Sequence, residues 1–171
     1  MKKLIFILFT IFSCFGVFGQ NFTFPEIKEG IKNVDEFIEQ LIDKGFIVVE
    51  KEISDTSDYT LFAWDYNKNT DIALTWAHVS RGKTTYIIDE KEVDKEEVLV
   101  ILKFFNPSNY SYLIRKIKQF CEKFDFEYDA KRNSYVNQYD HPDSVYFKFY
   151  KNSDGNFIEV SNYLDGQRLL K

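Results

Sequence analysis

The sequence predicts an α+β fold, a mostly antiparallel sheet with two amphipathic helices packed on one face. Two stretches carry apolar residues at helical spacing, and each is followed by a strand and then by two strands joined through a turn. Strands that follow one another through short turns pair antiparallel, and amphipathic helices bury their apolar stripe against one face of such a sheet. The two units, residues 33–80 and 109–164, also suggest a degenerate duplication, although their sequences share almost no identical residues.

The first helix is predicted to begin at Asn33, because Asn33 and Glu36 have the spacing of a capping box. Apolar residues then recur at helical spacing until Gly45 ends the pattern: Val34, Phe37, Ile38, Leu41 and Ile42.

The second helix is predicted over residues 109–123, with basic side chains on the face opposite its apolar side. The apolar side consists of Tyr110, Leu113, Ile114, Ile117, Phe120, Cys121 and Phe124.

Strands are predicted after each helix from alternating apolar residues and turn signals. After the first helix they cover 46–53, 59–66 and 71–79, and after the second they cover 124–129, 134–139, 145–150 and 156–163. A further hairpin is expected between the halves, from 84–89 and 98–105, around an acidic tip at 89–97.

The N-terminus has the charged, apolar and small-residue regions of a secretory signal peptide over residues 1–19. Cleavage after Gly19 leaves one domain, residues 20–171, in a secreted or periplasmic protein without a transmembrane segment. The alternative is a lipid anchor at Cys14 on the cell envelope. Phe12 stands where a lipobox has a small residue, and the apolar run 15–18 is unlike a flexible tether, so simple cleavage is favoured.

The charge balance excludes some partners. The chain has 22 basic and 27 acidic residues, a net charge of −5 that becomes −7 when Lys2 and Lys3 leave with the signal peptide. This balance argues against nucleic acid and anionic membranes and is compatible with a basic protein partner. Cys121 is then the one remaining cysteine, so no intrachain disulfide is expected.

No catalytic, cofactor or metal motif is complete. The segment 81–85, RGKTT, lacks the earlier glycine of a phosphate-binding loop and is interpreted as a hairpin turn, and 152–156, NSDGN, lacks the ligands of a calcium loop. His78 and His141 have no metal-ligand or nucleophile spacing, and Cys121 is expected to be a buried thiol. The six acids of the tip 89–97 are expected to be solvated, or else to dock into a basic cleft.

One binding surface can be proposed from the two hairpins. Pairing Tyr150 with Phe157 gives an ordinary half-buried hairpin in which Lys148 faces Glu159 on the polar side. The opposite face of that hairpin carries the apolar set Val145, Phe147, Phe149, Ile158 and Val160.

Pairing Tyr66 with Asp71 in the first hairpin instead gives an aromatic stripe of Phe62, Trp64 and Tyr66 on the face opposite the core. The core face would then hold Leu61, Ala63, Ile72, Leu74 and Trp76. The alternative is that the segment 21–27 or another loop covers the stripe and makes it core, and a register slip of one residue would exchange the two faces.

The sequence therefore suggests an exported, small, non-enzymatic binding module, most plausibly a protein-binding inhibitor or immunity-type protein. An envelope hydrolase using carboxylates or His78 and a small-ligand binding protein are the alternatives.

Overall fold

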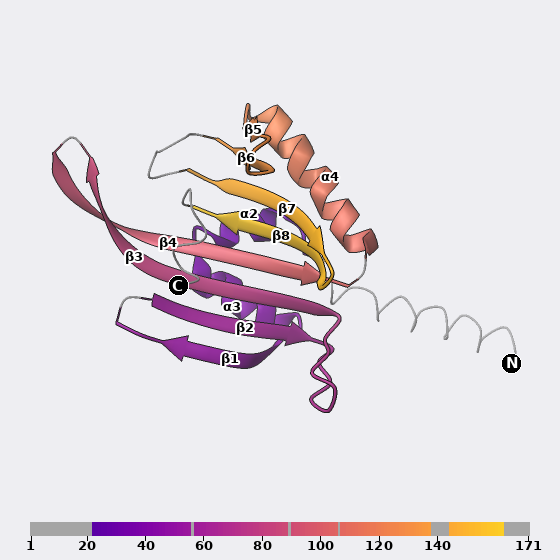
Figure 1. Ribbon diagram of the computed structural model, residues 1–171. Coiled ribbons are helices and arrows are strands. Elements are labelled where there is room, and N and C mark those ends of the chain that lie inside the picture. Colours follow the sequence, from indigo (N-terminus) through magenta and orange to yellow (C-terminus); the bar gives the residue numbers. More distant parts are fainter. Residues whose placement is uncertain (1–21, 56, 89, 106, 138–143, 163–171) are drawn as a thin grey trace, which may run out of the picture.

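The computed structural model describes residues 22–55, 57–88, 90–105, 107–137 and 144–162. These residues form three helices and an eight-stranded sheet (Figure 1). The helices are α2 (Phe24–Gly30), α3 (Val34–Asp43) and α4 (Pro107–Lys123). The strands are β1 (Ile47–Ile53), β2 (Ser57–Trp64), β3 (Thr75–Ile88), β4 (Lys91–Phe104), β5 (Glu127–Asp129), β6 (Ser134–Val136), β7 (Tyr146–Asn152) and β8 (Gly155–Ser161). The predicted signal peptide, the cleavage site and Cys14 lie outside the described residues.

The sheet is antiparallel throughout, in the order β1-β2-β3-β4-β8-β7-β6-β5. Helix α3 is followed by a four-strand meander from one edge to the centre, and α4 by a second meander from the other edge to the centre. The two meanders meet where β4 pairs with β8. The predicted α+β class is confirmed. Each of the two predicted helices is followed by four strands, whereas three strands were predicted after the first helix and four after the second.

The long β3–β4 hairpin corrects two sequence interpretations. The segment 81–85 lies inside β3 and is not a turn, and most of the acid-rich segment 89–97 lies inside β4 and is not a loop. Several charged residues of this segment face polar or oppositely charged residues across the ladder. Lys83 pairs with Glu96, and Thr84 pairs with Lys95. Strand pairing therefore continues through a sequence that looks like a turn.

Helix α2 was not predicted. Thr23 and Glu26 form a reciprocal capping box, and Pro25 in the first turn is preorganised for a helix. Lys44 lies 3.0 Å from the Glu26 carboxylate. Partial burial raises the pKa of Glu26, but the Thr23 backbone N–H and Lys44 outweigh it and leave that pKa below its usual value.

The two predicted helices are confirmed. Asn33 caps α3 by accepting from the backbone N–H of Glu36, although the Glu36 carboxylate bonds to the Asn33 side chain rather than to its backbone. Gly45 ends the helix with a φ of +86°. In α4 the residues Tyr110, Leu113, Ile117 and Cys121 are buried as predicted. Phe124 is the exception, since it follows the last turn and is 54% exposed.

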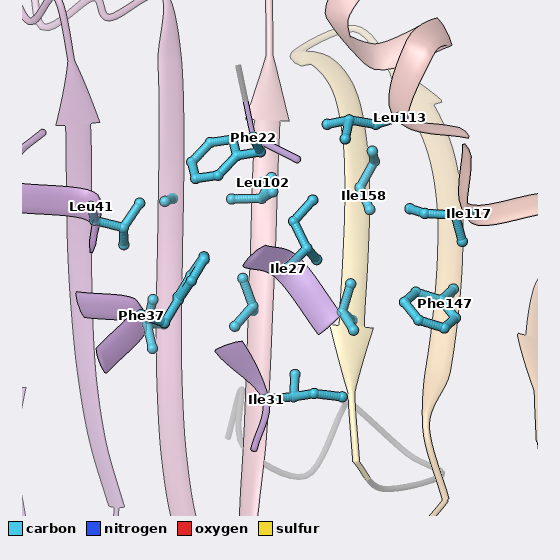
Figure 2. Packing of buried hydrophobic residues seen from close by; sticks show 14 of the residues in the cluster. Phe22, Ile27, Ile31, Phe37, Leu41, Leu102, Leu113, Ile117, Phe147 and Ile158 are labelled. Atoms are coloured by element: carbon cyan, nitrogen blue, oxygen red, sulfur yellow. The ribbon is translucent and has the colours of Figure 1, made fainter. Parts of the chain in front are cut away.

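All three helices contribute to one core on a single face of the sheet (Figures 1 and 2). Phe22, just before α2, lies against the rings of Phe37, Phe46 and Phe104 at centroid distances of 5.5–6.3 Å. Figure 2 shows Ile27 of α2 between the α3 side and Ile158 of β8. Because the helices occupy one face, the opposite face of the sheet has no helix over it among the described residues.

Candidate functional site

Phe62 and Trp64 of the predicted aromatic stripe lie on the helix-covered face, whereas Tyr66 contacts Trp76 on the opposite face. Phe62 is fully buried in the core cluster, and Trp64 is partly buried against that cluster. Tyr66 is half-buried after the end of β2, where its hydroxyl donates to Asp71 at 2.8 Å. The prediction that these three residues form one exposed stripe is wrong. For Phe62 the alternative is correct, because other parts of the chain cover its ring and make it part of the core. A binding role for Trp64 and Tyr66 stays a prediction.

The first hairpin is paired two residues away from the predicted register. Trp64 lies opposite Thr75 and Phe62 opposite Ala77, whereas the prediction placed Phe62 opposite Thr75. This shift does not move side chains between faces, because it is an even number of residues. The prediction instead exchanged the core face and the exposed face of the hairpin. Both faces of these strands carry large apolar residues, so the sequence pattern does not distinguish them. Two of the residues expected in the core, Ile72 and Leu74, are 56% and 44% exposed.

The face without helices is built of cross-strand rows, which the pairing registers define. We call this the open face. Its first row is Ala63, Trp76, Lys103, Phe157 and Tyr150. Its second row is Leu61, His78, Ile101, Glu159 and Lys148, and its third row is Tyr59, Ser80, Leu99, Ser161 and Tyr146.

The first row forms an aromatic surface across four strands. Phe157 and Tyr150 stack with their centroids 4.8 Å apart and their planes within 5°. The Lys103 ammonium lies 5.8 Å from the Phe157 ring centroid, and Trp76 contacts Tyr66 edge-on at 5.6 Å. These side chains are half-buried, so the open face presents stiff rings that are only partly covered.

The second row carries the charges of the open face. Lys148 lies 3.8 Å from the Glu159 carboxylate, as the sequence predicts. Burial raises the pKa of Glu159, and Lys148 only partly opposes that shift. Burial of the neighbouring Tyr150, and secondarily the Glu159 charge, raises the pKa of the Tyr150 phenol to about 12.

His78 lies in the same row, where its contacts resemble a catalytic arrangement. Its Nε2 is hydrogen-bonded to the Ser80 hydroxyl, and its ring stacks on Tyr59 with centroids 5.5 Å apart. Tyr59 donates in turn to the Glu50 carboxylate. Burial lowers the pKa of His78, although Glu50 opposes the shift, so the ring is neutral at neutral pH. Ser80, however, is only 3% exposed, so a substrate cannot reach its hydroxyl in this conformation.

Most of the third row is closed to partners, because Ser80, Leu99, Ser161 and Tyr146 are buried and Tyr59 alone of this row is partly exposed. The accessible part of the open face is therefore mainly the first two rows. Near the end of the first row, exposed Leu74 and Phe105 extend the apolar area, and the Phe105 backbone N–H donates to the Leu74 carbonyl.

Other reactive residues do not assemble into a site. Cys121 is fully buried, and burial raises the pKa of its thiol to about 12, in agreement with the predicted inert thiol. Within the described ranges, no three His, Cys, Asp or Glu side chains converge as metal ligands. His141 lies outside the described residues.

Comparisons with protein-family models, curated proteins and solved structures found no match to this chain. In the described part of the chain, no helix is long and apolar enough to cross a membrane.

Proposed function

We propose that this protein is an exported binding module that docks a protein partner on the open face of its sheet. The observation that carries the proposal is the aromatic row Trp76, Lys103, Phe157 and Tyr150, aligned by strand pairing on the face that the helices leave uncovered. Half-covered aromatic rings on a rigid sheet bury much area on binding and lose little side-chain entropy.

The charge distribution favours a partner with an apolar centre and a basic rim. Asp71 binds the Tyr66 hydroxyl next to Trp76 of the aromatic row, and Glu50 lies on β1 opposite Leu61 of the second row. The acidic net charge of the chain would accelerate the approach of a basic protein, and the aromatic row would supply most of the affinity. An inhibitor or immunity role, in which this face blocks a secreted enzyme or toxin, follows from such docking.

Photo-crosslinking in the native cells tests this proposal. We expect p-benzoylphenylalanine at position 76, in place of Trp76, to form a crosslink to one protein. The amount of crosslinked product should reach a plateau as irradiation continues. The same group at Tyr112, which is 44% exposed on α4, is the matched control and should not crosslink that protein. Equal crosslinking from both positions, or none from position 76, would refute docking on the open face.

A second candidate function is acyl hydrolysis by Ser80 with His78 as the base, favoured by the hydrogen bond between them. It requires an opening of the third row, because Ser80 is buried. A fluorophosphonate probe should then label the wild-type protein but neither Ser80→Ala nor His78→Gln. An unlabelled wild-type protein excludes this chemistry.

A further inference from the structure

A groove lies between α4 and the edge strands of the second meander, away from the open face. Its volume is about 460 Å³, within the size range of small-molecule sites. One wall is a single stripe of α4, formed by Tyr110, Ile114 and Lys118 at intervals of four residues. The lining is completed by Tyr128, Asn133, Tyr135, Phe149, Tyr150 and Lys151.

The polar groups of the groove are largely held by protein contacts. Tyr128 donates to the Asn133 side chain at 2.7 Å, and Asn133 donates to the Phe149 carbonyl at 2.5 Å. Asn133 has a φ of +49°, a conformation that asparagine tolerates better than most residues. The wall opposite α4 is therefore fixed before any ligand arrives, which lowers the entropic cost of binding.

Two donors remain at one end of the groove. Lys118 has no carboxylate partner among the described residues, and the Tyr135 hydroxyl has no hydrogen-bond partner there. Burial, followed by Cys121 and Glu122, raises the pKa of Tyr135, so its hydroxyl is a proton donor at neutral pH. Tyr135 pairs with Phe147, whose ring lies 6.4 Å from the Phe120 ring in the later turns of α4, so Tyr135 lies at the end of the groove that holds Lys118.

The other end of the groove is different in character. Lys151 lies 5.2 Å from the Tyr110 ring centroid, so its charge is already in contact with an aromatic face. Tyr110 and Lys118 are two helical turns apart, about 12 Å along the axis. Between them the walls are mainly apolar and aromatic, and none of the described residues that line the groove is acidic, although the chain as a whole has a net charge of −5.

We propose that this groove binds a small aromatic carboxylate, with its carboxylate at Lys118 and Tyr135 and its ring between Ile114 and Phe149. A cation and a phenol at one end match a carboxylate through charge-assisted hydrogen bonds, and the ring-lined middle of the groove matches a planar apolar body. The groove shares Tyr150 with the open face and no other lining residue, so its ligand binding can be tested separately from the proposed protein docking.

Calorimetric titration of the full chain with 2-naphthoate, and with its neutral counterpart 2-naphthamide, tests the site. We expect 1:1 binding of the naphthoate and at least tenfold weaker binding of the amide. Lys118→Gln should weaken naphthoate binding at least tenfold, and Tyr135→Phe should weaken it several-fold. Lys123→Gln is the matched control on the same helix and should leave the affinity unchanged, because Lys123 does not line the groove.

Absence of naphthoate binding, equal affinity for the amide, or an equal loss in Lys123→Gln would overturn the proposal. Two-dimensional amide NMR provides the location: the naphthoate should shift residues 114–118, 135 and 149. Shifts concentrated on Trp76 and Phe157 would instead place the compound on the open face and also overturn it.

Discussion

Truncating Phe62 and Trp76 separately tests which face of the first hairpin is the core. Phe62 is fully buried under the helices, so Phe62→Ala removes a complete ring from a close-packed core. Such a truncation costs about 3–5 kcal/mol of unfolding free energy. Trp76 lies half-covered on the open face, so part of its ring already contacts water. We expect Trp76→Ala to cost about 1–2 kcal/mol, in proportion to the smaller area removed from water on folding.

Urea unfolding followed by far-UV circular dichroism measures both changes. The m-value should stay constant, so that the midpoint shift reports stability alone. In a thermal scan, the loss in Phe62→Ala corresponds to a fall in Tm of about 6–20 °C for a domain of this size. The placement of the two faces is refuted if Phe62→Ala costs less than about 1 kcal/mol or if Trp76→Ala is the more damaging change.

Three further changes probe other parts of the fold. A Cβ at Gly30 would meet the Phe37 ring at 2.7 Å, so Gly30→Ala should lower the unfolding free energy by about 1–3 kcal/mol. Urea titration measures this loss, and an unchanged unfolding midpoint would contradict the close packing of Gly30 on Phe37. The lowered pKa of Glu26 contributes stability that is complete above the unfolded value of 4.5 and is lost as the pH falls through the folded pKa. Glu26→Gln should therefore lower stability at pH 7 and reduce its pH dependence below about 4.5, and parallel acid profiles of the two proteins would argue against the salt bridge with Lys44. Native Cys121 should not react with a thiol reagent at pH 8 and should react fully in denaturant, whereas rapid native labelling would show that the thiol is accessible.

The second hairpin could be predicted in detail because its sequence leaves one solution. Phe147, Phe149, Ile158 and Val160 all alternate with polar residues, and the turn at 151–155 fixes the register, so the Tyr150 and Phe157 pairing is confirmed. The buried set and the Lys148–Glu159 contact follow from that register.

The first hairpin could not be resolved in the same way, because both of its faces are apolar. Leu61 and Trp76 on one side and Phe62 and Trp64 on the other satisfy either assignment. The deciding information is tertiary, since the helices settle which face is covered. Helix α2 was missed although its signal was present: Thr23 and Glu26 have the spacing of a capping box, and Pro25 follows the cap, but the helix has only seven residues.

The candidate sites show the same limit of sequence reasoning. An aromatic surface was predicted, and the open face has one, but it consists of Trp76 from β3 and of Tyr150 and Phe157 from the β7–β8 hairpin, which lies far from β3 in the sequence. The α4 groove likewise combines a helical stripe with residues of β5–β7 and carries no local motif. Neither site could be assembled before the strand order was known.

The central claim is that the open face is the docking surface, and the affinity of the crosslinked partner for the double variant Trp76→Ala and Phe157→Ala tests it most directly. Removing two central rings should weaken binding by at least about 30-fold, the loss typical of interface hot spots. The thermal transition should stay cooperative, and Tyr112→Ala should bind with the wild-type affinity. Unchanged affinity of the double variant, with its fold intact, would contradict the account.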